Sequence, residues 1–93
     1  MQNDVEIMLS KKKILLKAVG KIVQTKRKEL NVGINKFSFE YDIGNGLLTR
    51  LERGDTDTQI TTLWKLANAF NLKCSELVLL IESELPEDFN FYD

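Results

Sequence analysis

The sequence contains no histidine and only one cysteine, Cys74, among its 93 residues. These absences remove intramolecular disulfides, the usual zinc ligand sets and histidine-based nucleophilic or acid–base catalysis. Carboxylates are plentiful, but no glycine-rich loop accompanies them as a phosphate cradle. We therefore expect no enzyme, no catalytic residue, no cofactor and no metal site.

Long hydrophobic runs are absent too. No apolar run is long enough to span a bilayer, and the lysines that begin at Lys11 interrupt the first apolar patch too early for a secretory signal. The hydrophobic fraction of 43% and the charged fraction of 29% fit an ordered soluble domain. We expect a cytoplasmic protein without a membrane partner, small enough for a homodimer to supplement its core.

A net charge of −1 conceals a strongly polarised chain. Residues 11–28 carry eight basic side chains and no acid, whereas residues 76–93 carry six acids and no base. A basic amino-terminal half favours a polyanion such as DNA through counterion release. The alternative is a solvated lysine face that complements the acidic end of the same protein or of a dimer partner.

Apolar spacing predicts an all-α fold of five helices without an internal repeat. The expected helices cover about residues 11–30, 34–41, 44–53, from 57 or 58 to about 70, and 75 to about 85. The expected caps are Ser10 for the first helix, Asp57 or Thr58 for the fourth and Ser75 for the fifth. The expected stops, in chain order, are Asn31 with Gly33, then Asp42, Gly54, Asn71 and Pro86.

Two short segments flank the helical domain of residues 11–85. Residues 1–10 form an amino-terminal arm in which Val5, Ile7 and Leu9 alternate with other residues, a pattern that favours a short extended segment. Residues 86–93 form an acidic tail in which Phe89 and Phe91 alternate with polar residues. We expect this tail either to pair with the arm as a small strand or to remain disordered.

Most of the large side chains in the helical domain are expected to lie in the core. We expect a core position for Phe37, Tyr41, Trp64, Phe70 and Cys74, with Trp64 partly exposed because Leu63 and Leu66 already occupy the inward stripe of their helix. The run 77–81 is apolar at every position, so a single helix cannot bury it on one side. Part of the fifth helix should therefore meet another surface.

The segment from Ile43 to Gly54 carries two kinds of side chain on two sides of one short helix. Leu48 and Leu51 share one side, whereas polar residues project from the other: Asn45, Thr49 and Arg50. Two helices joined by a tight turn, the second with polar residues near its start, form the arrangement that places a recognition helix in the major groove of DNA.

Residues 19–78 resemble the Cro/C1-type (Xre-like) helix-turn-helix domain of bacterial and phage repressors. The matching letters are VGK at 19–21, RKE at 27–29, RLERG at 50–54, LWKLANAFNL at 63–72 and SELV at 75–78. RLERG and the downstream TLWKLANAF block are specific in combination. The resemblance implies a five-helix, lambda-repressor-like domain in which the second and third helices read double-stranded DNA.

The resemblance also assigns site residues. It implies base contacts from Asn45, Gly46, Thr49 and Arg50, and an ion pair in which Arg27 ties the first helix to Glu52 at the end of the third. Phosphate contacts are expected from Ile34, Asn35, Lys36, Arg53 and Thr56, and the triplet Lys11, Lys12 and Lys13 would follow the DNA backbone as a basic arm.

Several of these assignments have a plainer alternative. Arg50 suits guanine and Asn45 suits adenine, at about 1–3 kcal/mol of discrimination each. Alternatively, Asn45 bonds its own backbone, Arg50 touches phosphate only, and the lysines merely solubilise the first helix. For Arg27 and Glu52 the alternative is an exposed ion pair worth about 0–1 kcal/mol.

We thus predict a sequence-specific DNA-binding transcriptional regulator, a repressor that binds a palindromic operator as a homodimer. The alternative is a protein-interaction module of the same fold, such as an antitoxin or a partner-repressor-binding protein. Phe39 and Leu47 motivate this alternative because they occupy positions that are usually polar in the family, and the fifth helix offers a further surface.

Overall fold

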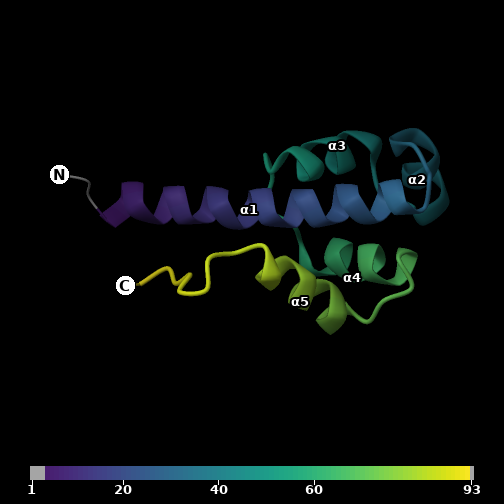
Figure 1. Cartoon of the computed structure of the whole chain (residues 1–93). Coiled ribbons are helices and arrows are strands. Elements are labelled where there is room, and N and C mark those ends of the chain that lie inside the picture. The colour runs from purple at the N-terminus through teal and green to yellow at the C-terminus, as the bar shows by residue number, and fades with distance from the viewer. Residues whose placement is uncertain (1–3, 93) are drawn as a thin grey trace.

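A computed structural model describes residues 4–92 of the chain. Its elements are α1 (Asp4–Glu29), α2 (Ile34–Tyr41), α3 (Asn45–Arg53), α4 (Ile60–Ala69) and α5 (Cys74–Ser83), and the described residues contain no strand. In Figure 1, α2 and α3 lie on one side of the long α1, and α4 and α5 lie on the other. The predicted all-α, five-helix architecture is confirmed.

The core lies around the carboxyl-terminal half of α1. The largest side chains that are at most 1% exposed come from all five helices: Val23, Phe37, Leu48, Leu51, Leu66 and Leu77. Phe37 also packs against the rings of Tyr41 and Phe70, with centroids 4.7 and 5.5 Å away. This common core fixes α3 on α1 and α2, and so determines which side of α3 faces solvent.

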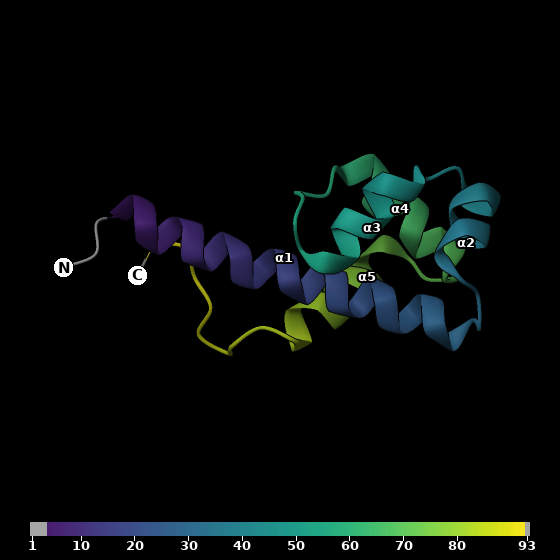
Figure 2. The same ribbon diagram turned by 90° about the horizontal axis from the view of Figure 1, so that it is seen from above.

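The first helix begins earlier than the sequence predicts. It starts at Asp4 instead of after Ser10, so the extended segment expected at Val5, Ile7 and Leu9 is wrong. Asp4 and Glu6 in the first turn favour the helix dipole. Residues 1–3 of the predicted arm lie outside the described residues. The amino-terminal half of α1 projects beyond the bundle, as Figure 2 shows from above.

The carboxyl-terminal tail folds back along this projecting half of α1 (Figures 1 and 2). Phe91 and Tyr92 line a hollow together with Ile7 and Met8. The Lys11 ammonium donates a hydrogen bond to the Asn90 carbonyl oxygen. The tail therefore packs as an irregular segment against a helix, and neither the predicted strand nor a detached tail is found.

Several helix ends follow the predicted signals. Asp42 closes α2 in the left-handed conformation (φ 53°), and the next N–H, of Ile43, donates to the Ser38 carbonyl oxygen at 3.1 Å. Asn31 and Asn71 follow α1 and α4 at φ 58° and 59°. Short polar side chains tolerate this conformation better than most non-glycine residues.

The amino-terminal caps of α4 and α5 differ from the prediction. Gln59 and Lys73 hold these positions, in place of Asp57 or Thr58 and of Ser75. At α5 the Glu76 carboxylate accepts the backbone N–H of Lys73 at 2.8 Å, so the stabilising side chain comes from inside the helix.

Trp64 is 55% exposed, in line with the expected partial exposure but too much for a core position, whereas Cys74 is buried as expected. Both residues line a hollow of about 810 Å³ at the junction of α4 and α5. On α5, Leu79 is 65% exposed, as the continuous apolar run predicts. Within residues 4–92, no helix combines the length and the apolar character that crossing a bilayer requires.

Candidate nucleic-acid interface

Helix α3 presents a polar side to solvent and an apolar side to the core. Leu48 and Leu51 are at most 1% exposed. On the opposite side, Asn45, Gly46 and Arg50 are exposed, and so is Arg53 at the end of the helix; Thr49 is half-buried. All four predicted base-contact residues therefore share one outward side of a short helix that rests on α1 and α2.

The carboxyl-terminal end of α3 is joined to α1 by a buried ion pair. Arg27 donates from Nε and Nη2 to the two carboxylate oxygens of Glu52 at 2.7 and 2.8 Å, and from Nη1 to the Val32 carbonyl oxygen at 2.8 Å. The two charged side chains are only 8% and 3% exposed. The hydrogen bonds that Arg27 donates to Glu52 raise the pKa of Arg27, and the coulombic attraction of Glu52 also raises it, whereas burial lowers it.

Gly20 lets α3 approach the backbone of α1 closely. A Cβ atom at this position would lie 2.5 Å from the Glu52 carbonyl oxygen and 2.6 Å from that of Leu51. Both neighbours are main-chain atoms, so they cannot move aside as a flexible side chain would. Gly20 belongs to the VGK letters of the family resemblance, but nothing in the sequence shows what lies opposite it.

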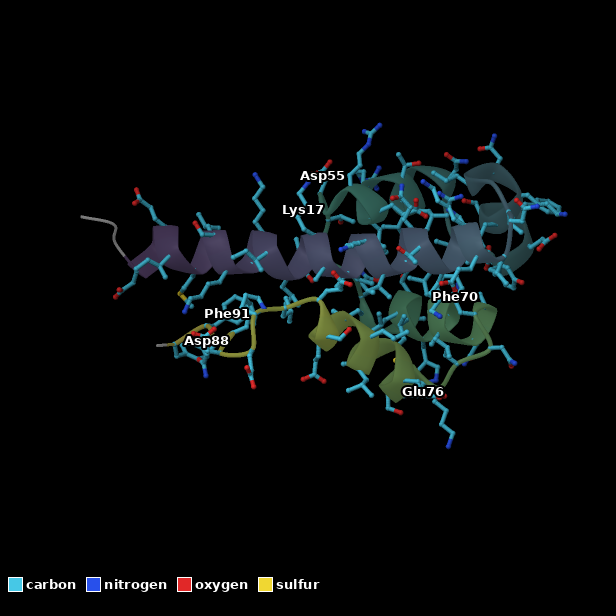
Figure 3. The ribbon with its side chains drawn as sticks, in the orientation of Figure 1. Lys17, Asp55, Phe70, Glu76, Asp88 and Phe91 are labelled. Carbon is cyan, nitrogen blue, oxygen red and sulfur yellow. The ribbon has the colours of Figure 1, made fainter. Side chains whose placement is uncertain are left out.

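A third attachment comes from Lys17, which Figure 3 shows beside the end of α3 near Asp55. Its ammonium group donates to the Arg53 carbonyl oxygen at 2.7 Å. Gly54 follows in the left-handed conformation (φ 76°), and a Cβ there would be 3.0 Å from the Lys17 Cα. A cation at a helix carboxyl terminus also complements the helix dipole.

The amino-terminal end of α3 is attached to α2 by two amides. The side-chain nitrogen of Asn45 donates to the side-chain oxygen of Asn35, and both residues are exposed. The Thr49 hydroxyl donates to the Asn45 carbonyl oxygen at 2.9 Å. The Arg50 guanidinium lies 3.2 Å from the place that a Cβ of Gly46 would occupy, so this glycine leaves room for the arginine.

The predicted phosphate contacts divide between two places beside α3. At the start of α2, Ile34 is half-buried, Asn35 and Lys36 are exposed, and no side chain caps the helix. Its first N–H groups therefore have neither an intrahelical partner nor a side-chain cap. After α3, Arg53 is exposed and Thr56 is half-buried.

The lysine triplet does not form a separate arm. Lys11, Lys12 and Lys13 lie within the long helix α1, and they point to different neighbours. Lys11 contacts the tail at Asn90, and Lys12 lies 3.9 Å from a carboxylate oxygen of Asp57 in the loop after α3. Lys13 lines a hollow that includes further basic residues of α1, Lys17 and Lys21.

The fold and the exposed side of α3 define a helix-turn-helix domain. In agreement, a family model described as "Helix-turn-helix" matches residues 23–77, more than half of the chain. The chain therefore belongs to this helix-turn-helix family of the Cro/C1 type, whose members are DNA-binding regulators and not enzymes. Comparison with curated proteins and with solved structures gives no match.

Proposed function

We propose that the protein is a sequence-specific transcriptional regulator, a repressor, that places α3 in the major groove of DNA. The observation that supports this most strongly is the two-sided character of α3. Leu48 and Leu51 are fully engaged in the core, while the polar side chains predicted to read bases face solvent. Such a regulator would act in the cytoplasm, where bacterial and phage DNA lies.

The exposed side chains of α3 offer complementary base-reading chemistry. Arg50 presents donors for the two acceptors of guanine, and Asn45 presents an amide for adenine. The Thr49 hydroxyl donates its hydrogen within the helix, so its oxygen is left to accept from a base amino group. Gly46 brings no side chain, and we assign it the role of admitting the Arg50 guanidinium close to the helix.

Phosphate contacts would frame these base contacts. The uncapped start of α2 offers the N–H groups of Ile34 and Asn35 together with the Lys36 side chain, a combination that suits an anion. Arg53 and Thr56 would contact the backbone beyond the other end of α3. Among the lysine triplet we rank Lys13 first, because Lys11 and Lys12 already lie against Asn90 and Asp57.

A homodimer on a palindromic operator is the natural form of such a reader. Two copies related by a two-fold axis would place their α3 helices in half-sites about 34–36 Å apart. Binding by several phosphate contacts would weaken steeply with salt.

Selection of bound duplexes from a random DNA library tests this function. We expect an enriched palindrome, and Arg50→Ala should lower the preference for it over random DNA by roughly tenfold, within the range of one bidentate base contact. Lys12→Ala should lower the preference for the operator by less than Arg50→Ala does. It should reduce the slope of log affinity against log salt concentration by at most about one. Unchanged operator affinity in both variants would show that the assignment of α3 as the DNA-binding element is wrong.

A second candidate function is that of a protein-interaction module, such as an antitoxin or a protein that binds a partner repressor. It is favoured by the exposed Leu79 and by a hollow of about 630 Å³ that α5 and the tail line mainly with apolar residues. Affinity purification from the native host, beside the DNA selection, separates the two functions. Recovery of a protein partner whose binding is lost in Leu79→Glu, together with no enriched DNA sequence, would favour the interaction module.

A further inference from the structure

Phe39 is a large apolar side chain that the fold leaves uncovered. It is 89% exposed on α2, whereas Phe37, two residues earlier, has no exposed surface. Burying an aromatic ring of this size is normally favourable, so an exposed one at a hollow marks a place where another molecule can cover it.

Its surroundings belong to the predicted DNA-reading face. Phe39 follows Asn35 by one turn, on the side of α2 that is turned to the start of α3. Both residues line a hollow of about 450 Å³ together with Gly44 and Asn45. Since Asn45 also bonds the Asn35 amide, the ring and the two amides form one continuous surface from two helices.

This combination of groups matches the major-groove edge of A·T base pairs. Adenine offers an acceptor and an amino donor that suit an asparagine amide, and its partner thymine carries a C5-methyl group that suits an apolar side chain. A G·C pair presents no methyl group in this groove. Resting on the proposed function, we propose that Phe39 is a specificity-determining DNA contact whose ring packs on a thymine methyl group next to the base read by Asn45.

The position of the hollow favours DNA over a protein as the occupant. It opens beside the exposed start of α3, so a protein docked on Phe39 would cover Asn45 as well. The apolar surface of α5, which suits a protein partner, lies on the other side of α1 (Figure 1). We therefore expect the DNA bound by α3 to cover the Phe39 ring.

Replacement of single thymines by uracil in the selected operator tests this contact, because the exchange removes only the C5-methyl group. For the wild-type protein we expect about a fourfold loss of affinity at one thymine in each half-site, the value that burial of one methyl group supplies. Phe39→Ala should bind the thymine operator at least fourfold more weakly and should not distinguish it from the uracil operator. Phe39→Leu should retain part of the distinction.

Trp64→Ala is the matched control, because it removes an exposed aromatic ring of α4 and should preserve the wild-type response. Thermal unfolding of each variant verifies that the fold is intact. If every uracil operator binds the wild-type protein as well as the thymine operator, or if Phe39→Ala remains sensitive to the exchange, the proposed contact is wrong. Failure of the wild-type protein to enrich any DNA sequence would instead refute the proposed function, and the contact with it.

Discussion

The two ends of α3 are held in different ways. Its carboxyl-terminal end is fixed to α1 by the buried Arg27–Glu52 pair, by close packing on Gly20 and by the bond from Lys17. Its amino-terminal end has no side-chain cap and is joined to α2 by the exposed Asn35–Asn45 bond. The direction of the helix is thus set at the end away from Asn45, and polar groups at the other end remain available to a ligand.

Breaking the buried Arg27–Glu52 pair should have the largest effect on stability. Arg27→Ala leaves the Glu52 carboxylate buried without its partner, which we expect to lower the free energy of unfolding by about 3–5 kcal/mol. Urea denaturation measures this loss. Lys28→Ala, a change at the exposed neighbouring position, should stay within about 0.5 kcal/mol.

The pH dependence of that loss follows from the raised pKa of Arg27. A group whose pKa is raised on folding contributes its full stability below its unfolded pKa, and this stability is lost only as the pH rises through the folded value. The difference between Arg27→Ala and the wild-type protein should therefore stay constant from about pH 7 to about pH 9, since arginine titrates far above this range. A difference that shrinks across this range, or one below about 1 kcal/mol, would contradict the assigned role.

A substitution that pushes α3 away from α1 should have the next largest effect on stability. Gly20→Ala forces a methyl group against two main-chain oxygens, so we expect a loss of about 1–3 kcal/mol and a lower operator affinity from a displaced α3. Gly33→Ala is the matched control for stability, because a Cβ there meets no atom within 4 Å. Equal unfolding midpoints for the two variants would show that the close approach does not constrain α3.

Releasing the amino-terminal end should change recognition more than stability. Asn35→Ala frees the Asn45 amide, and we expect unfolding to change by less than about 0.5 kcal/mol, as is usual for exposed positions. The Asn35→Ala protein should discriminate less between the operator and operators in which the adenine read by Asn45 is replaced. Gln24→Ala, a change on the exposed surface of α1, should leave this discrimination unchanged. A uniform loss of affinity across all sequences would identify Asn35 as a phosphate contact only.

The sequence predicts the helix-turn-helix unit well because its signals are local. Helix α2 matches its predicted bounds, and α3 begins one residue later than expected, at Asn45. The left-handed residue Asp42 and the glycine at the end of α3 are short-range signals that require no knowledge of the remaining chain. The alternation of Leu48 and Leu51 with polar residues likewise indicates which side of α3 is buried.

The features that the sequence could not predict depend on residues far apart in the chain. Gly20 and Lys17 become informative only when α3 lies beside them, and nothing in their own neighbourhood reveals this contact. The alternating residues Val5, Ile7 and Leu9 resemble a strand, but they lie in α1, and the returning tail meets this part of the helix at Ile7 and Met8. Similarly, the bond between Asn35 and Asn45 depends on the angle between two helices, which spacing alone does not specify.

The hollow at the junction of α4 and α5 gives the molecule an internal reporter. It is lined by Trp64 and Cys74, each of which occurs once in the chain. Because the thiol is buried in the folded state, its rate of reaction with a disulfide reagent would measure how often α5 separates from its neighbours. The nearby indole would report the same opening by fluorescence, without any engineered label.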